Sequence, residues 1–434
     1  MKNGDDTIAA KVIKAIEIFS KADLWAQKTK YNKDDYSKLL FDYAELLYKY
    51  GLYNDSKEVF LRLIPLSEEL YGKENEKTSS LYNSTGSVFW RQGNYSYALE
   101  YYFKALEIRE RKLGKEHPDT AQSYNNIGTV YQEQGYYDMA LEYYLKALAV
   151  FKIVHGTEHS EVATSYNNIG IVYHDKGDHN SALEYHFKAL EINEKVFGID
   201  HINTAASYNN IGIEYDEMGC YDKALEFYFK SMRIMEKSLG IDHPDTATIY
   251  NNIGMVYNSQ KEYSKALEYF FKTLEICLKV LGLEHPSTAT TYNNIGMVYL
   301  DQNDYNNALK HYFKALEIRE KTVGSDHPAT ASSYNNIGSA YMNQGHYDKA
   351  LEYHFKALEA REKVLGSNHP DTASSYNNIG SVYYALGDFI KALDYLNKAY
   401  LILKKTLGPK HPNTASVFES ICIVKKDIAS FNDL

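Results

Sequence analysis

The chain has 434 residues, of which 44% are apolar and 24% charged, a balance typical of folded rather than disordered proteins. Its formal net charge of −10 argues against nucleic acid as a main partner and against attachment to a membrane surface, because both need a basic face. Three cysteines, Cys220, Cys277 and Cys422, form no CxxC pair, so we expect reduced thiols and a cytoplasmic protein rather than a disulfide framework or a zinc site.

Residues 1–36 are expected to form an N-terminal capping helix region. Their segment "MKNGDDTIAAKVIKAIEIF" carries acidic residues early and lacks the long apolar core of a signal peptide. No stretch of about 18 apolar residues occurs, so we expect no transmembrane helix.

From about residue 37 onward, one pattern returns every 42 residues. A glycine behind a Tyr-Asn pair marks each clear copy, at Gly86, Gly128, Gly170, Gly212, Gly254, Gly296, Gly338 and Gly380. The same phase reaches Ala44 before them and Cys422 after them. We therefore expect one degenerate repeat, eight clear repeats and a C-terminal capping helix over residues 37–427, followed by a tail at 428–434.

Each repeat contains two predicted helices, as residues 117–156 illustrate. Pro118 suits a first helical turn, and apolar residues then recur at helical spacing up to Gly135, which suits a left-handed turn. A second helix starts at Tyr137 and ends at Gly156. In two repeats the turn glycine is replaced by Lys261 or Asn303. Asparagine tolerates the left-handed conformation better than lysine does, so we expect local strain or a different cap at residues 260–262.

The residues at these spacings resemble the tetratricopeptide repeat, whose pattern of aromatic residues, Leu-Gly and alanines is matched by Tyr124, Ile127, Gly128, Tyr131, Ala140, Tyr144 and Ala147. The 42-residue length, the "NN" pair and the "LG–HP" connector are similar to the kinesin light chain subtype. This resemblance implies an all-α fold, a right-handed superhelical solenoid of antiparallel helix pairs. Kinesin light chains also carry a heptad coiled-coil arm that binds the motor, and no sustained heptads precede the repeats here.

The resemblance further implies that the first helices line a concave groove that binds a peptide. The asparagine after each tyrosine offers both a donor and an acceptor to an extended peptide backbone. These groove candidates are Asn83, Asn125, Asn167, Asn209, Asn251, Asn293, Asn335 and Asn377. The second asparagine of each pair lies about 100° further round the helix and is expected to tie neighbouring hairpins together.

Positions further along the first helices vary and are expected to select the ligand. The middle repeats offer the apolar residues Ile171, Ile213, Met255 and Met297, together with the acidic residues Asp175, Asp216, Glu217 and Asp301. The N-terminal mouth instead carries Trp90 and Arg91. Kinesin light chains use basic groove residues for acidic peptides, and these have no counterpart in the middle repeats. We therefore expect a protein or peptide ligand that is extended and neutral or basic in its middle.

No pattern of catalytic or metal-binding residues stands out, so we expect no enzyme activity, no cofactor and no metal. One histidine per repeat precedes the first helix, and we interpret it as a helix cap; other histidines, such as His174, His179 and His186, are scattered along the chain. The function we expect is a protein-interaction adaptor or scaffold. Alternatives are a structural or self-assembling scaffold, or a regulatory subunit of a separately encoded enzyme or motor.

Overall fold

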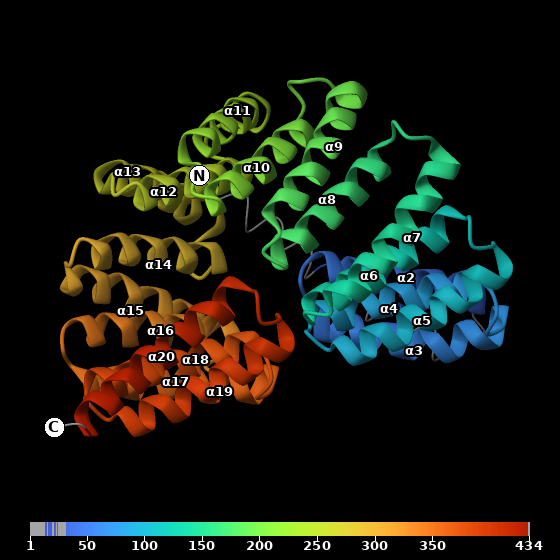
Figure 1. Ribbon diagram of the computed structural model, residues 1–434. Helices are drawn as coiled ribbons and strands as arrows, with labels where there is room; N and C mark the ends of the chain where they lie inside the picture. Colours follow the sequence, from blue (N-terminus) through green and yellow to red (C-terminus); the bar gives the residue numbers. More distant parts are fainter. Residues whose placement is uncertain (1–13, 15, 20, 23, 25–31, 433–434) are drawn as a thin grey trace. The chain divides into compact units, whose positions relative to one another are not determined.

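The computed structural model describes residues 14, 16–19, 21, 22, 24 and 32–432 (Figure 1). Most of the expected capping region at residues 1–36 lies outside these residues. Every regular element in the described part is a helix, so the predicted all-α class is confirmed. None of the described helices combines the length and the apolar character needed to cross a membrane.

The chain divides into two compact units, Met1–Val172 and Tyr173–Leu434, and each consists of antiparallel helix pairs. In the first unit the pairs are α2 with α3, α4 with α5, and α6 with α7. Their bounds are α2 (Lys33–Lys49), α3 (Tyr53–Tyr71), α4 (Glu76–Arg91), α5 (Tyr95–Lys112), α6 (Pro118–Glu133) and α7 (Tyr137–His155). Helix α8 (Ser160–Asp175) begins in this unit and ends in the second.

The second unit continues the same arrangement from α9 (His179–Phe197) onward. The pairs that follow are α10 with α11, α12 with α13, α14 with α15, α16 with α17, and α18 with α19, and α20 packs on α19. Their bounds are α10 (Ile202–Glu217), α11 (Tyr221–Leu239), α12 (Pro244–Ser259), α13 (Tyr263–Ile276), α14 (Pro286–Asp301), α15 (Tyr305–Thr322), α16 (Pro328–Asn343), α17 (Tyr347–Leu365), α18 (Pro370–Ala385), α19 (Phe389–Thr406) and α20 (Pro412–Asn432). A short π-helical segment, η1 (Cys277–Leu281), extends α13.

The recurring histidine caps the first helix of its repeat, as predicted. In His117, for example, Nδ1 accepts a hydrogen bond of 3.2 Å from the backbone N–H of Asp119. The bond recurs at His159, His201, His243, His285, His327, His369 and His411. Such a bond satisfies one of the N–H groups that a helix start leaves without a partner, and Pro118 at the next position has no N–H to satisfy.

The glycine of each first helix lets a large side chain of the second helix approach closely. A Cβ added at Gly128 would lie 3.0 Å from the ring of Tyr144, which is buried. The left-handed turns also form where glycine is absent: Lys261 has φ 62° and Asn303 has φ 61°. The repeat frame therefore imposes the turn on Lys261, a conformation that a lysine adopts only at a cost in free energy.

Candidate functional site

The first helices of successive repeats contact one another within each compact unit. These contacts join α2, α4 and α6 in one unit and α10, α12, α14, α16 and α18 in the other. We call the face that these helices share within one unit the first-helix wall of that unit. It carries the predicted groove positions, and side chains 43 residues apart meet across it, as the following hydrogen bonds demonstrate.

The paired asparagines form bonds between adjacent first helices. Nδ2 of Asn126 donates to Oδ1 of Asn83 over 2.8 Å. The same bond joins Asn252 to Asn209 over 2.8 Å and Asn294 to Asn251 over 2.6 Å. The expected inter-repeat role of the second asparagine is confirmed for these three residues. Its partner is the first asparagine of the preceding repeat, which keeps its own N–H₂ group for other contacts.

Several of the first asparagines are buried, although a residue that contacts a ligand in a groove has to be accessible. Asn125, Asn293 and Asn335 are buried, and Oδ1 of Asn125 has no hydrogen-bond partner. Asn335 accepts from Nδ1 of His354 over 2.9 Å and donates to Oγ of Ser375 over 3.3 Å. Contact between the predicted asparagines and a peptide stays a prediction, while the structure assigns several of them bonds within the protein.

The predicted apolar positions of the second unit are half-buried, and Ile171 is more exposed. Met255 and Ile213 are half-buried and pack against core clusters of their own repeats, and Met297 is half-buried as well. Ile171 is 38% exposed. Partly exposed apolar side chains of this kind add contact area for a ligand without weakening the core.

Among the described residues, Asp216 and Glu217 of α10 form no ion pair with a lysine or arginine, although Glu217 acts electrostatically on His174. Burial and the neighbouring carboxylate of Glu217 raise the pKa of Asp216 to about 6. Asp301, by contrast, accepts a hydrogen bond of 2.7 Å from Nδ2 of Asn258. On the wall of the second unit, Asp216 and the exposed Glu217 are thus acidic groups without a Lys or Arg partner in the described part of the chain.

The N-terminal mouth is basic and aromatic, and its groups contact one another. The guanidinium of Arg91 lies 4.5 Å from the ring centroid of Trp90, and its Nε donates to the hydroxyl of Tyr48 over 3.2 Å. The bond to Tyr48 raises the pKa of Arg91. Such an arrangement holds a cation over an aromatic surface.

The structure brings together residues that the sequence analysis treats as scattered. His174, His179 and His186 lie around Glu214, a carboxylate that is only 1% exposed. Burial favours a raised pKa for Glu214, but the imidazoles of His174 and His179 outweigh it and hold the pKa below its ordinary value. One signal for this cluster exists in the sequence: Glu214 stands where Val88, Val130, Val172, Val256, Val298 and Val382 stand in other repeats.

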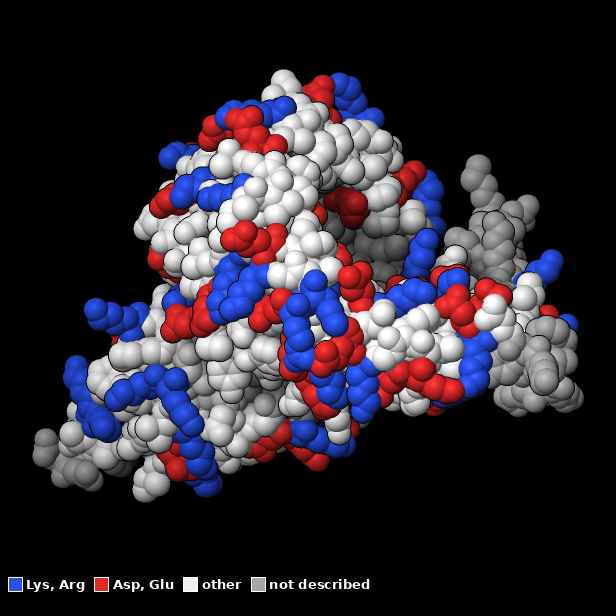
Figure 2. All heavy atoms as spheres, turned by 90° about the vertical axis from the view of Figure 1, so that its right-hand side faces the viewer, with Lys and Arg blue, Asp and Glu red and all other residues white. Residues whose placement is uncertain are grey.

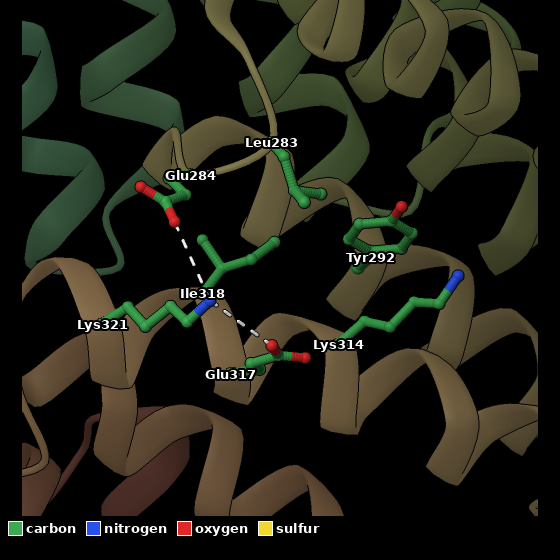
Figure 3. A pocket seen from close by; sticks show the side chains of 7 residues that line it. All are labelled: Leu283, Glu284, Tyr292, Lys314, Glu317, Ile318 and Lys321. Atoms are coloured by element: carbon green, nitrogen blue, oxygen red, sulfur yellow. Dashed lines mark ion pairs between the residues drawn. The ribbon is translucent and has the colours of Figure 1, made fainter.

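A pocket of about 260 Å³ lies between α14, α15 and the connector before α14 (Figure 3). Lys321 reaches across it to Glu284 over 3.8 Å and to Glu317 over 3.6 Å. Lys314, which also lines the pocket, lies 5.0 Å from the ring centroid of Tyr292.

Charges on the outer helices alternate in sign. On the face that Figure 2 draws, Lys/Arg and Asp/Glu groups are interspersed rather than gathered into one large patch. Pairs four residues apart on the second helices, such as Glu226 with Lys230 over 2.7 Å and Glu268 with Lys272 over 2.7 Å, account for part of this pattern.

Comparisons with known proteins agree with this geometry. A family profile described as tetratricopeptide repeat matches overlapping segments at residues 35–111, 98–153, 119–195, 161–237, 215–279, 245–321, 287–363, 329–405 and 371–421. No protein with a curated description matches the sequence.

Several solved structures are similar in fold. A Rap protein complexed with Competence and Sporulation Factor has a TM-score of 0.55 and 16% identity, covering 83% of this chain and 96% of its own. The apo form of RapI has a TM-score of 0.51 and 22% identity, covering 66% and 98%. A Podosopora anserina protein described as a kinesin light chain with nearly identical TPR-like repeats has a TM-score of 0.40 and 22% identity, covering 48% and 98%. At these identities the likenesses bear on the fold alone.

Proposed function

Because the chain belongs to the tetratricopeptide repeat family, we propose that it is a non-enzymatic adaptor or scaffold whose first-helix wall binds an extended peptide segment of a partner protein. Stacked helical repeats expose long, continuous surfaces that suit such partners. A Rap protein of similar fold has been crystallised with Competence and Sporulation Factor, which supports the view that this fold accommodates a partner.

The pair Asp216 and Glu217 carries the proposal most directly. A half-buried carboxylate without a cationic partner costs free energy, which a ligand cation recovers. Ile213 lies three residues before Asp216 and therefore on the same face of α10. The wall thus presents an apolar side chain next to two carboxylates, which fits a peptide with lysine or arginine beside apolar residues.

A charge-scanned peptide library tests this proposal. The peptides have equal length and carry lysine, glutamine or glutamate at their central positions, and fluorescence anisotropy reports binding to the full chain. We expect tighter binding of the lysine and glutamine series. The double variant Asp216→Asn with Glu217→Gln should bind the lysine series roughly 3- to 10-fold more weakly.

Glu226→Gln with Glu268→Gln is the matched control, because it removes the same charge from exposed second-helix positions. It should leave peptide affinity unchanged. Preference for the glutamate series, or equal weakening by the control, contradicts the proposal. Molecular size that grows with protein concentration, without peptide binding, favours the self-assembling scaffold instead.

A further inference from the structure

Four side chains that break the repeat pattern lie next to one another in the second compact unit. Glu214 takes the place of a small apolar residue, and His179 takes the place of an aromatic one. His186 stands where most repeats carry Tyr or Phe, and His174 ends the first helix before it. The counterparts of His179 are Tyr95, Tyr137, Tyr221, Tyr263, Tyr305, Tyr347 and Phe389. Such a concentration of metal-ligating residue types in one place calls for a physical explanation.

Two histidine nitrogens face the two oxygens of the buried carboxylate. Nδ1 of His174 lies 2.9 Å from Oε1 of Glu214, and Nδ1 of His179 lies 3.0 Å from Oε2. The ligand atoms of the three residues all lie within 4.8 Å of one another. Donor atoms around a tetrahedral zinc ion, at about 2.0–2.1 Å from it, are separated by about 3.3 Å. Small side-chain adjustments therefore suffice to place one ion among them.

The nitrogen of His174 pairs with Glu214 by charge but not in the geometry of a hydrogen bond. Despite its short distance to Glu214, this buried Nδ1 has no partner in hydrogen-bonding geometry. A buried polar atom without a hydrogen bond costs free energy, and a metal–nitrogen bond recovers that cost. The carboxylates of Asp175 and Glu217 act on His174 electrostatically as well, so the surroundings favour a cation.

We propose that His174, His179 and Glu214 bind one divalent transition-metal ion of the Zn²⁺ class through the two Nδ1 atoms and the carboxylate. Imidazole nitrogen and carboxylate oxygen are the ligands that zinc takes in this kind of site. The ion joins the last turn of α8, the first residue of α9 and the middle of α10, and so fastens two consecutive repeats together. His186 lies beside the site, with Nε2 at 3.8 Å from Oε1 of Glu214.

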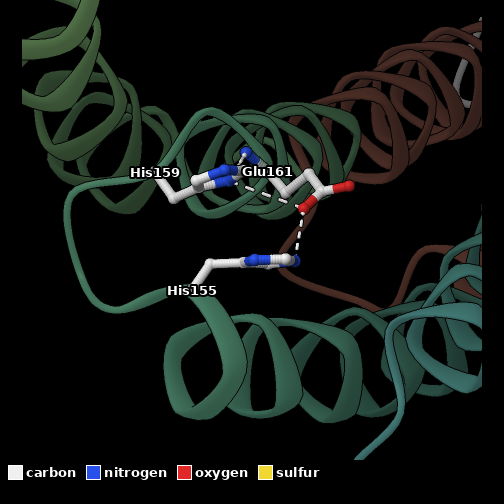
Figure 4. A group of neighbouring side chains, drawn as sticks. All are labelled: His155, His159 and Glu161. Atoms are coloured by element: carbon white, nitrogen blue, oxygen red, sulfur yellow. Dashed lines mark hydrogen bonds and ion pairs between the residues drawn. The ribbon is translucent and has the colours of Figure 1, made fainter.

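A second group of similar composition does not meet the same requirements (Figure 4). Nε2 of His155 lies 2.8 Å from Oε2 of Glu161, and the imidazoles of His155 and His159 stack at 4.3 Å. However, Nδ1 of His159 accepts the capping hydrogen bond from the backbone N–H of Glu161, over 3.3 Å. That nitrogen is already used, so we assign this group to helix capping and an ion pair.

Equilibrium dialysis of the chelator-treated full chain against Zn²⁺ tests the site, with bound metal counted by atomic spectroscopy. We expect one Zn²⁺ per wild-type chain and a rise in the thermal unfolding midpoint on binding. Glu214→Val restores the residue of the other repeats and should fold normally while binding Zn²⁺ about 100-fold more weakly or worse. His179→Tyr, which also restores a repeat residue, should have the same effect.

Two control variants test whether Zn²⁺ binding depends on this site and not on other histidines of the chain. His155→Leu restores the residue found at Leu113 and removes the group of Figure 4, and it should bind Zn²⁺ as the wild type does. His354→Tyr removes a buried histidine that has no carboxylate partner, and it should also leave binding unchanged. The proposal is overturned if the wild type takes up no Zn²⁺, or if Glu214→Val and His179→Tyr retain wild-type affinity.

Discussion

His186 in α9 and His354 in α17 occupy the same position of the repeat, but their surroundings differ. Both side chains are 1% exposed, and burial lowers the pKa of each to about 4. His186 lies near the buried carboxylate of Glu214, whereas Nδ1 of His354 bonds with the amide oxygen of Asn335. One repeat frame therefore accepts the same residue beside a buried carboxylate and beside an amide, where the cation of Arg361 also acts on it.

The difference shows what each neighbourhood needs. A neutral imidazole is satisfied by one acceptor, and the oxygen of Asn335 fixes the proton on Nδ1 of His354. A buried carboxylate needs hydrogen-bond donors or positive charge, and the ring nitrogens of His174 and His179 face the two oxygens of Glu214. We therefore expect the free energy of unfolding to fall strongly when the histidine partners of Glu214 are removed. Around His354 we expect it to change mainly with pH and with packing.

The largest effect is expected when both imidazole partners of Glu214 are removed. The double variant His174→Ala with His179→Ala should lose roughly 3–5 kcal/mol of unfolding free energy, because it leaves the buried carboxylate with only the more distant His186, at 3.8 Å. Urea unfolding in the presence of a chelator measures this loss. Adding Glu214→Val to the same variant should restore most of the stability, since the charge is then gone. If the triple variant is as unstable as the double variant, lost packing rather than the buried charge causes the loss of unfolding free energy.

The pH dependence of stability tests the neighbourhood of His354 next, by comparison of wild type with a His354 variant in which His186, whose pKa is also about 4, is kept. The pKa of His354 is about 4 in the folded chain and about 6.5 when unfolded, so its contribution is fully present above pH 6.5. As pH falls from 6.5 to 4, the unfolded state binds the proton first and up to about 3 kcal/mol is lost. His354→Tyr removes this loss. The urea midpoint of the variant should therefore rise relative to that of the wild type as pH falls through this range; a constant difference between the two curves would contradict the prediction.

Packing at His354 gives a smaller effect. A Cβ added at Gly338 would lie 2.7 Å from Cε1 of His354, so Gly338→Ala should cost about 1–3 kcal/mol of unfolding free energy. In a His354→Ala background the ring is absent and the same change should cost clearly less. A double-mutant cycle from thermal unfolding measures this coupling. Additive costs would show that the clash with the ring is not the cause.

The repeat frame was predictable because its signals are local and recur eight times. Pro118, Gly135 and the histidine before each first helix mark helix starts and ends within a few residues, and the structure confirms them. The turn at Lys261 was flagged because one residue departs from an otherwise constant position, and its positive φ confirms the expected conformation.

The cluster at Glu214 could not be predicted in the same way. Its members lie up to 40 residues apart, and their meeting depends on how two consecutive hairpins are rotated against each other. The meeting of side chains 43 residues apart on the first-helix wall has the same origin, because it combines the repeat length with one further residue of a helix. The sequence signal for such a cluster is a pair of adjacent repeats that both depart from the repeat pattern.

The smallest expected effect concerns the hydrogen bonds between asparagines of adjacent first helices, and it is measured by comparing two Asn→Ala variants. Nδ2 of Asn252 donates to Oδ1 of Asn209 over 2.8 Å, so Asn252→Ala should cost about 0.5–1.5 kcal/mol of unfolding free energy. The matched variant is Asn336→Ala, two repeats on. Asn293 stands to Asn336 as Asn209 stands to Asn252. In the amide orientation that satisfies both groups, the side-chain oxygen of Asn293 accepts a hydrogen bond of 2.7 Å from Nη1 of Arg319.

That oxygen is therefore not available to Asn336, and Asn336→Ala should cost less than Asn252→Ala. Urea unfolding of the two variants side by side measures the difference. Equal costs would indicate that the second asparagine acts through its own helix rather than through the bond to the preceding repeat. A larger cost for Asn252→Ala, together with unchanged peptide binding, would assign the second asparagine to the stack and leave ligand choice to residues such as Asp216.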